Sequence, residues 1–372
     1  MNLPFPITSP TLLIDEQICR ANLKRMADKA KRNGLRLVPH FKTPQSIQIG
    51  EWVKDYGVKE ITVSSLKMAA YFAEKGWEKI HIAFPFNPLE IPSLHELAKK
   101  QPLSIQLVNE ETTLMLVEKL EYPISFFIEI DAGYGRTGVK VSDFGKIEAM
   151  LRLANSSDKL RFRGFYIHAG HSYHAAVEGL RVIHEQNKAA LQMLKDKYRT
   201  EFPELITRTG DTPTCSMFDE FGDIDEIGPG NFMFYDLTQA RIGSCRKKDI
   251  AIALAVPVVD IQKERGEILV HGGGVHLSKD VLIGPDGGRC YGEVVHLAEK
   301  GWEIAGDPSF LKSISQEHGI IKANDELMKK VKVGDVLGIL PIHSCMTADC
   351  MGEYFDLSGN SLDHLKGRYF QY

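Results

Sequence analysis

The stretch "IDEQICRANLKRMADKAKRNGLRLVPHFKTPQS", residues 14–46, predicts one helix followed by one strand. Asp15 can cap the start of the helix, apolar residues recur at helical spacing, and Gly34 can close its end. The apolar run 35–41 then has the character of a buried strand, and it ends next to Lys42. We derive the fold from this helix–strand unit.

The same alternation continues through the first two thirds of the chain. Eight strand-like segments alternate with segments of helical period, and they cover residues 35–41, 60–65, 79–85, 103–108, 124–131, 162–170, 205–210 and 226–231. A clear helix is expected at 177–198. Strands that alternate with helices form a parallel sheet, and eight such units close into a (β/α)8 barrel. The sequence therefore predicts an α/β fold of the TIM type.

The character of the chain changes after about residue 245. Strand-like pieces separated by glycine-rich turns follow, among them "IAIALAVPVVDIQ", "GEILVHGGGVHL", "GWEIAGDP" and "GDVLGILPIHSCM". This pattern favours a second, mostly antiparallel β domain. We expect a barrel domain at 10–245 and a β domain at 246–372. Residues 1–9 are assigned to neither, and one alternative is that they belong to the β domain.

Composition narrows the class of protein. The chain is 43% hydrophobic and 25% charged, with a net charge of −4, which is ordinary for a globular protein and gives no electrostatic reason to expect nucleic-acid or membrane partners. It lacks a run of about 18 apolar residues and the basic start of a signal peptide. We therefore expect a cytoplasmic protein whose six cysteines are free thiols.

Candidate cofactor residues follow the predicted strands, where barrel enzymes place their chemistry. Lys42 is either a surface lysine or a Schiff-base nucleophile. The motifs "TGDTPT" (209–214) and "GPGN" (228–231) either make simple turns or bind phosphate. Arg136 either lies on the surface or hydrogen-bonds an anionic oxygen. A lysine, a phosphate cup and an arginine on one rim favour pyridoxal 5′-phosphate (PLP).

A candidate metal motif lies in "PIHSCMTADC", residues 341–350. On a strand, His343 and Cys345 would share one face, and imidazole plus thiolate favours zinc. A chance pair at a strand end is the alternative, and Asp349 and Cys350 are further candidate ligands. Two protein ligands would leave positions for water or substrate, as catalytic sites do.

Taken together, these motifs resemble those of one enzyme family. In order, "PHFKT", "DAGYGRTGV", "GFYIHAGHSY", "TGDTPT", "EIGPGNFMFYD" and "PIHSCMT" are similar to motifs of the D-serine dehydratase / D-threonine aldolase family of alanine-racemase-like, fold type III PLP enzymes. The resemblance runs from about Thr11 to Asp356. It implies a homodimer, with a site formed where the barrel and the β domain meet.

The resemblance also implies residue roles. The catalytic residues would be Lys42, which carries the cofactor, Arg136, which faces the cofactor phenolate, and Tyr166, near the ring. The full set expected to bind the cofactor is Lys42, His40, Arg136, Tyr166, Thr209, Gly210, Thr212, Gly230, Asn231 and Tyr235. His40 is alternatively a satisfied core histidine. His343 and Cys345 match the zinc pair of the eukaryotic-type D-serine dehydratases, whereas aldolase members tend to have aspartate in place of the cysteine.

The resulting expectation is a PLP-dependent lyase that uses zinc or another divalent metal. It would dehydrate and deaminate a β-hydroxy-D-amino acid to a 2-keto acid and ammonia. Retro-aldol cleavage to glycine and an aldehyde is the first alternative, and amino-acid racemisation is the second. The sequence departs from the family at Val38, Pro44, Gln45 and His271, and D-serine, D-threonine and 3-hydroxy-D-aspartate all stay open as substrates.

Overall fold

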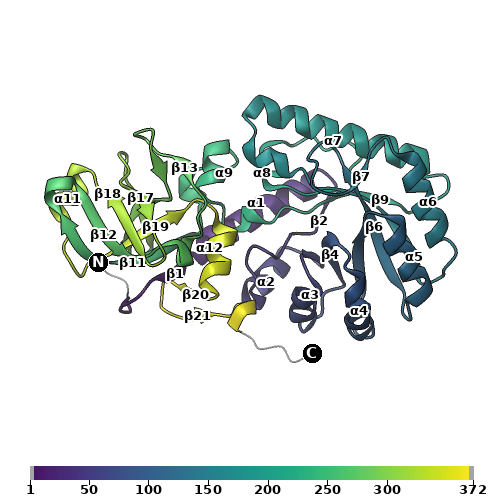
Figure 1. Cartoon of the computed structure of the whole chain (residues 1–372), viewed down its shortest axis with the longest axis horizontal. Coiled ribbons are helices and arrows are strands. Elements are labelled where there is room, and N and C mark those ends of the chain that lie inside the picture. Colours follow the sequence, from purple (N-terminus) through teal and green to yellow (C-terminus); the bar gives the residue numbers. More distant parts are fainter. Residues whose placement is uncertain (1–3, 368–372) are drawn as a thin grey trace. The chain divides into compact units, whose positions relative to one another are not determined.

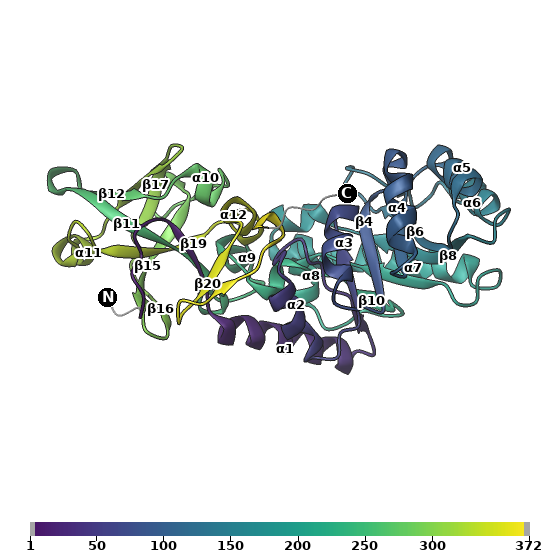
Figure 2. The same ribbon diagram turned by 90° about the horizontal axis from the view of Figure 1, so that it is seen from below.

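The computed structural model describes residues 4–367, which fall into two compact units (Figures 1 and 2). The barrel unit contains Lys24–Lys42 and Ile49–Gly230, and the β unit contains 4–23, Thr43–Gln48 and 231–367. Compactness alone does not define an independently folding domain, so the limits 10–245 and 246–372 stay a prediction. Within residues 4–367, no helix is long and apolar enough to span a membrane, and none of the six cysteines is in a disulfide.

The barrel unit is built on eight parallel strands in the order β2-β10-β9-β8-β6-β5-β4-β3. Their bounds are β2 (Arg36–Leu37), β3 (Glu60–Val63), β4 (Lys79–Pro85), β5 (Leu103–Leu107), β6 (Ile124–Asp131), β8 (Leu160–Ile167), β9 (Ile206–Thr209) and β10 (Glu226–Ile227). A short strand, β7 (Val139–Lys140), pairs with the end of β6. Each of the eight overlaps its predicted segment, and the predicted TIM-type fold is confirmed.

The barrel closes where the chain leaves β2. The Phe41 N–H donates to the Thr62 carbonyl at 2.7 Å, and the Thr62 N–H donates to the Pro39 carbonyl at 2.9 Å. On the other side, the His40 N–H donates to the Pro229 carbonyl at 2.9 Å. The segment after β2 is therefore bonded to both neighbouring strands, and Lys42 comes directly after it.

Helices alternate with these strands, as Figure 1 shows. Their bounds are α1 (Glu16–Arg32), α2 (Ile47–Lys54), α3 (Leu66–Ala73), α4 (Ile91–Ala98), α5 (Glu110–Lys119), α6 (Phe144–Ala154), α7 (Val177–Tyr198) and α8 (Thr212–Met217). The Ile18 N–H donates to Asp15 Oδ1 at 3.0 Å, and Gly34 adopts a φ of +67°, which glycine tolerates best. Both predicted ends of α1 and the predicted helix 177–198 are thus confirmed.

Charged side chains are buried in the barrel unit beside its apolar core. Glu226 is fully buried and accepts from Arg208 Nε at 2.6 Å, from Arg36 Nη2 at 2.6 Å and from Arg163 Nη2 at 3.1 Å. Although burial opposes ionisation, the three guanidinium charges hold the pKa of Glu226 below its ordinary value. This network ties β2, β8, β9 and β10 together.

The β unit contains a closed six-stranded antiparallel barrel. Its strands are β11 (Ile252–Gln262), β12 (Glu267–His271), β15 (Gly292–Ala298), β17 (Phe310–Ile314), β18 (His318–Lys322) and β19 (Val336–Pro341). Closure follows because β11 pairs with both β12 and β19. The predicted antiparallel β architecture is confirmed. The remaining elements are β1 (Thr11–Ile14), α9 (Leu237–Ile242), α10 (Gly274–Leu277), β13 (Leu282–Ile283), β14 (Arg289–Cys290), β16 (Gly301–Ile304), α11 (Asp325–Lys330), α12 (Ser344–Met351), β20 (Tyr354–Asp356) and β21 (Ser361–Leu362).

Candidate active site

Lys42 shares the mouth of the barrel with two histidines. Its backbone N–H donates to His40 Nδ1 at 3.2 Å, while its side chain is exposed. Burial, followed by the charge of Lys42, lowers the pKa of His40 well below its ordinary value. The same two causes lower the pKa of His168 to about 3. Both imidazoles are therefore neutral beside the lysine.

Tyr166 lies deeper in the same unit, against a glycine. A Cβ built on Gly210 would lie 3.1 Å from Tyr166 Oη and 3.0 Å from the Gly228 carbonyl oxygen, so a side chain would crowd both. The Gly210 carbonyl is in turn hydrogen-bonded to His168 Nδ1. Burial raises the pKa of Tyr166, which leaves a neutral hydroxyl beside this glycine.

The predicted phosphate cup has a feature that suits an anion. Thr209 is 1% exposed, and among the described residues its Oγ1 has no hydrogen-bond partner. Such buried polar atoms are rare and often mark an absent ligand or water. Thr212 begins α8, and its N–H donates to Tyr173 Oη at 3.4 Å. Gly230 is buried at the end of this unit. The orphaned hydroxyl beside small, buried residues fits the phosphate of PLP.

Arg136 lies in the loop after β6, with an exposed side chain. Its guanidinium packs over the ring of Tyr134, 5.0 Å from the ring centroid, and the Tyr134 ring stacks on His171 at 5.8 Å. The charge of Arg136 nevertheless contributes to lowering the pKa of His168, after burial and Lys42. The structure thus brings Arg136 to the rim while its guanidinium packs on Tyr134, so its expected contact with the cofactor phenolate stays a prediction.

Asn231 and Tyr235 belong to the β unit. Asn231 Nδ2 donates to Asp236 Oδ2 at 2.6 Å and to Ser344 Oγ at 3.0 Å, and it lies 3.6 Å from Cys345 Sγ. Within the described chain, the buried Asn231 Oδ1 has no partner. Tyr235 has a φ of +50°, a left-handed conformation that a non-glycine residue adopts at a cost of about 1–3 kcal/mol. Such strain is concentrated at functional sites.

The predicted strand geometry of the metal motif is wrong. Strand β19 ends at Pro341, and helix α12 begins at Ser344, so His343 is the N-cap residue and Cys345 lies in the first turn. The helix forms because the Ser344 N–H donates to the buried Asp236 Oδ2 at 3.0 Å, and the Thr347 N–H closes the first turn on the His343 carbonyl at 3.1 Å. A helix start, rather than a shared strand face, brings the two side chains together.

The surroundings of His343 and Cys345 suit a cation. His343 Nδ1 lies 3.3 Å from Asp280 Oδ2, and the imidazole also hydrogen-bonds the Cys345 thiol. Burial by itself lowers the pKa of His343, but these two hydrogen bonds and the nearby negative charges raise it to about 11. Asp280 places a carboxylate beside the imidazole, as metal-binding histidines commonly have. The nitrogen and sulfur donors fit zinc.

Of the two further candidate ligands, Asp349 is paired with other residues, and Cys350 is partly buried. Asp349 accepts from Gln45 Nε2 at 3.1 Å and pairs with Lys366 Nζ at 2.8 Å. Burial raises the pKa of the Cys350 thiol, which disfavours the thiolate that a metal needs. Gln45, one of the family departures, has a φ of +44° and so joins Tyr235 as a strained residue of the β unit.

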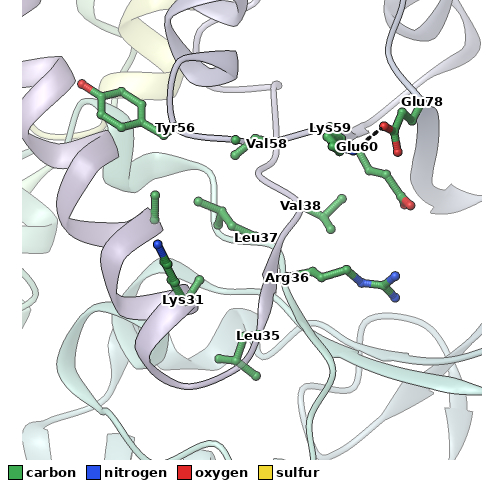
Figure 3. Close-up of a pocket in the computed structure, with 13 residues that line it drawn as sticks. Lys31, Leu35, Arg36, Leu37, Val38, Tyr56, Val58, Lys59, Glu60 and Glu78 are labelled. Carbon is green, nitrogen blue, oxygen red and sulfur yellow. Dashed lines mark ion pairs between the residues drawn. The ribbon is translucent and has the colours of Figure 1, made fainter.

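A groove of about 390 Å³ occurs elsewhere on the barrel unit (Figure 3). Leu35–Val38 and Val58–Glu60 line it, so it lies at the amino ends of β2 and β3. The ion pair between Lys59 and Glu78 at its edge spans 2.9 Å between exposed side chains. Barrel enzymes place catalysis at the opposite ends of the strands, so this groove is not the active site.

Sequence reasoning did not assign a role to His168 or Asp280. The available signal for His168 was its position two residues after Tyr166, within the segment predicted as a strand, because alternate residues of a strand share a face; in the structure it directly follows β8. Asp280 is distant from His343 in sequence, and no local pattern links them. Of the predicted residues, the barrel unit holds His40, Lys42, Arg136, Tyr166, Thr209, Gly210, Thr212 and Gly230, and the β unit holds Asn231, Tyr235, His343 and Cys345.

Comparison with known proteins identifies the family of the chain. Residues 14–237 match the family described as "Alanine racemase, N-terminal domain", and residues 251–356 match a D-serine dehydratase domain. D-serine dehydratase of Dictyostelium discoideum is 27% identical over 393 residues, covering 95% of this chain and 94% of that protein. D-threo-3-hydroxyaspartate dehydratase of Delftia sp. (strain HT23) is 27% identical over 357 residues, covering 92% of each.

Solved structures of a D-threo-3-hydroxyaspartate dehydratase superpose over nearly the whole chain. A cysteine-to-alanine mutant described as the metal-free form has a TM-score of 0.88 at 25% identity, covering 98% of this chain and 99% of that one. A histidine-to-alanine mutant, altered two positions before that cysteine, also has a TM-score of 0.88 at 25% identity. It covers 98% of this chain and 96% of that chain.

Proposed function

Because this chain belongs to the alanine racemase N-terminal domain family and carries a D-serine dehydratase domain, we propose that it is a PLP- and metal-dependent lyase of β-hydroxy-D-amino acids. The family is PLP-dependent. The observation that carries the proposal is the His343–Cys345 pair, with Asp280 3.3 Å from the imidazole and with the thiol 3.2 Å from Thr43, the residue after Lys42. Two dehydratases aligned over more than 90% of this chain support dehydration as the reaction.

The cofactor would be held by residues on the rim of the barrel and at the start of the β unit. We propose that Lys42 carries PLP and that the phosphate takes up the Thr209 hydroxyl, which otherwise has no partner among the described residues. The other proposed cofactor contacts are His40, Arg136, Tyr166, Gly210, Thr212, Gly230, Asn231 and Tyr235. PLP, when bound, supplies an electron sink that stabilises negative charge at the substrate α-carbon.

Lys42 would remove the α-proton. His40 and His168 are neutral, so neither places a second positive charge beside the amine when it takes up that proton. Loss of the α-proton and of the β-hydroxide then gives an amino-enoate. This product tautomerises and hydrolyses to one 2-keto acid and one ammonia, so the two products should appear in equal amounts.

His343 and Cys345 would hold zinc or another divalent metal. A metal at this pair acts as a Lewis acid toward the β-oxygen of the substrate. The D-threo-3-hydroxyaspartate dehydratase whose cysteine mutant is described as metal-free has a histidine and a cysteine with the same spacing, which supports this assignment. Asp280 would orient His343, as a carboxylate behind a metal-binding histidine commonly does.

The test is to incubate the PLP- and zinc-loaded protein with D-serine, D-threonine and threo-3-hydroxy-D-aspartate and to measure ammonia, keto acid and glycine separately. We expect ammonia and keto acid in equal amounts, with both lost in Lys42→Ala and in Cys345→Ala. Cys350→Ala, on the same helix, is the matched control and should remain active. Glycine plus an aldehyde would show the aldolase reaction instead, and inversion of the α-carbon without either product would show a racemase.

We also propose a homodimer and a cytoplasmic location, as the family resemblance and the composition imply. Mass determination in solution tests the first, since a monomeric active enzyme would contradict it. Fractionation of the source cells tests the second.

A further inference from the structure

A second group of metal-ligand side chains lies in the β unit, separate in sequence from the His343–Cys345 pair. His271, His276 and Glu317 each place one ligand atom within 4.8 Å of the other two. His271 Nε2 lies 3.5 Å and His276 Nε2 lies 3.6 Å from the same oxygen, Glu317 Oε2. The two imidazole rings are nearly perpendicular, at 85°, with centroids 5.8 Å apart. Both imidazoles therefore converge on one carboxylate oxygen.

The backbone holds these three residues in place from two sides. His271 ends β12, and Glu317 directly precedes β18, the strand paired with β12. The Gly272 N–H donates to the Glu317 carbonyl at 2.8 Å, and the Gly274 N–H donates to the Ser315 carbonyl at 2.7 Å. Figure 2 shows β12, β17 and α10 in this part of the β unit. The loop that carries both histidines is thus bonded to the turn that carries the glutamate.

Gly273 allows this close approach. A Cβ at this position would lie 2.5 Å from the carbonyl oxygens of both Ser315 and Gln316, a distance that real side chains do not reach. A glycine here therefore lets the His271–His276 loop lie directly on the 315–317 turn. The arrangement is a constructed junction between two turns rather than a chance meeting of flexible surface side chains.

We propose that His271, His276 and Glu317 form a second divalent-metal site, which binds zinc. Two imidazoles and one carboxylate are a ligand set that zinc uses, and three protein ligands leave one position for water. The side chains of His271 and Glu317 are 41% and 47% exposed and that of His276 is 15% exposed, so solvent reaches the site from one side. The site does not depend on the proposed lyase activity.

Zinc binding makes one demand on the ring proton of His276. The Gly273 N–H donates to His276 Nδ1 at 3.1 Å, so the neutral ring carries its proton on Nε2, toward Glu317. If zinc binds Nε2, the ring proton moves from Nε2 to Nδ1. Nδ1 then no longer accepts from the Gly273 N–H, which can donate to water instead. No net proton is released from His276 in this exchange.

The experiment is equilibrium dialysis of the PLP-loaded full chain against buffered Zn²⁺, with zinc per chain measured by mass spectrometry. We expect two zinc ions in the wild type, and one in His271→Ala and in Glu317→Gln. Cys345→Ala should keep one ion, and Cys345→Ala/Glu317→Gln should keep none. His318→Ala is the matched control, because His318 lies directly across from His271 on β18 but outside the group, and it should keep two.

The result that overturns the proposal is equal zinc content in Cys345→Ala and Cys345→Ala/Glu317→Gln, whether one ion or none. Equal loss in His318→Ala would overturn the ligand assignment as well. Cobalt substitution distinguishes the two sites without relying on activity, because only the Cys345 site should give a thiolate-to-cobalt charge-transfer band. The wild type could instead bind one zinc ion that is lost in Glu317→Gln and kept in Cys345→Ala. That result would support the site at His271, His276 and Glu317 and would contradict metal binding by Cys345.

Discussion

Thr43 Oγ1 lies 3.2 Å from Cys345 Sγ, although the two residues are 302 positions apart in the chain. Thr43 follows Lys42 directly, so the residue after the proposed PLP lysine is in contact with the proposed metal ligand. Thr43 is thus joined to the proposed PLP lysine by a peptide bond and contacts the proposed metal ligand Cys345 through its side chain. The contribution of the Thr43 side chain can therefore be measured by substitutions that leave Lys42 and Cys345 unchanged.

Thr43→Val should weaken zinc binding at His343 and Cys345. Valine has nearly the shape of threonine but cannot donate a hydrogen bond to the thiolate, and loss of such a supporting contact costs about 10–100-fold in metal affinity. Competition with a chromophoric chelator measures the change in Kd. Thr43→Ser keeps the hydroxyl and should bind zinc as the wild type does; equal weakening in both variants would mean that the methyl group, not the hydrogen bond, matters.

Asp280→Asn should also lower zinc affinity at this pair, by about 10–100-fold, because the carboxylate behind His343 would lose its negative charge. Asp286→Asn is a suitable control, since Asp286 pairs with Lys322 at 2.8 Å on an exposed turn. Titration with a zinc indicator at fixed pH reports both. Unchanged affinity in Asp280→Asn would show that His343 is oriented without it.

Glu226→Gln should destabilise the barrel unit. The glutamine would leave the three arginines that converge on this position without their shared counter-charge, and breaking a buried ion pair costs about 3–5 kcal/mol of unfolding free energy. Urea denaturation measures it. Glu78→Gln breaks one exposed ion pair, with Lys59, and should leave the stability nearly unchanged. Similar values for the two variants would contradict a central role for the buried network.

His81 should make the protein less stable in acid. It is 1% exposed, and burial first, then the charges of Arg208 and Arg163, hold its pKa well below the ordinary value. The unfolded chain therefore binds a proton below pH about 6.5 that the folded chain refuses, so stability falls as pH falls from there toward the folded pKa.

Urea denaturation of His81→Gln at pH 7, 6 and 5 isolates this contribution. The variant should lose less stability across that range than the wild type, whatever its stability at pH 7. His318→Gln, at an exposed position, should follow the wild type. Parallel curves for His81→Gln and wild type would exclude His81 as the acid-sensitive group.

The fold could be read from the sequence because its signals are local. Asp15 and Gly34 mark the ends of α1, and the spacing over 177–198 alone gave both ends of α7. The error at His343 has the same origin. "LGILPIHSC" is apolar and strand-like, whereas the helix start depends on Asp236, a residue more than a hundred positions earlier in the chain. A distant cap cannot be seen in a local pattern.

The residues of the candidate site that belong to local sequence motifs were predictable, whereas those brought together only by the fold were not. Lys42, Gly210 and Gly230 each follow a strand, and the carboxyl ends of the strands of a parallel barrel meet at one rim. The contacts of Asp280 with His343, and of Glu317 with His271, join segments that no spacing rule connects. The stacking of Arg136 on Tyr134 likewise depends on side-chain packing after folding.

The closure of the eight-stranded barrel has a consequence for quality control of the protein. The last hydrogen bonds of the closure are made by His40 and Phe41, and Lys42 is the next residue. Breaking these hydrogen bonds would open the barrel, and it would also free the backbone that positions Lys42. A chain in which these hydrogen bonds have not formed should therefore also lack a fixed position for Lys42, the proposed PLP lysine.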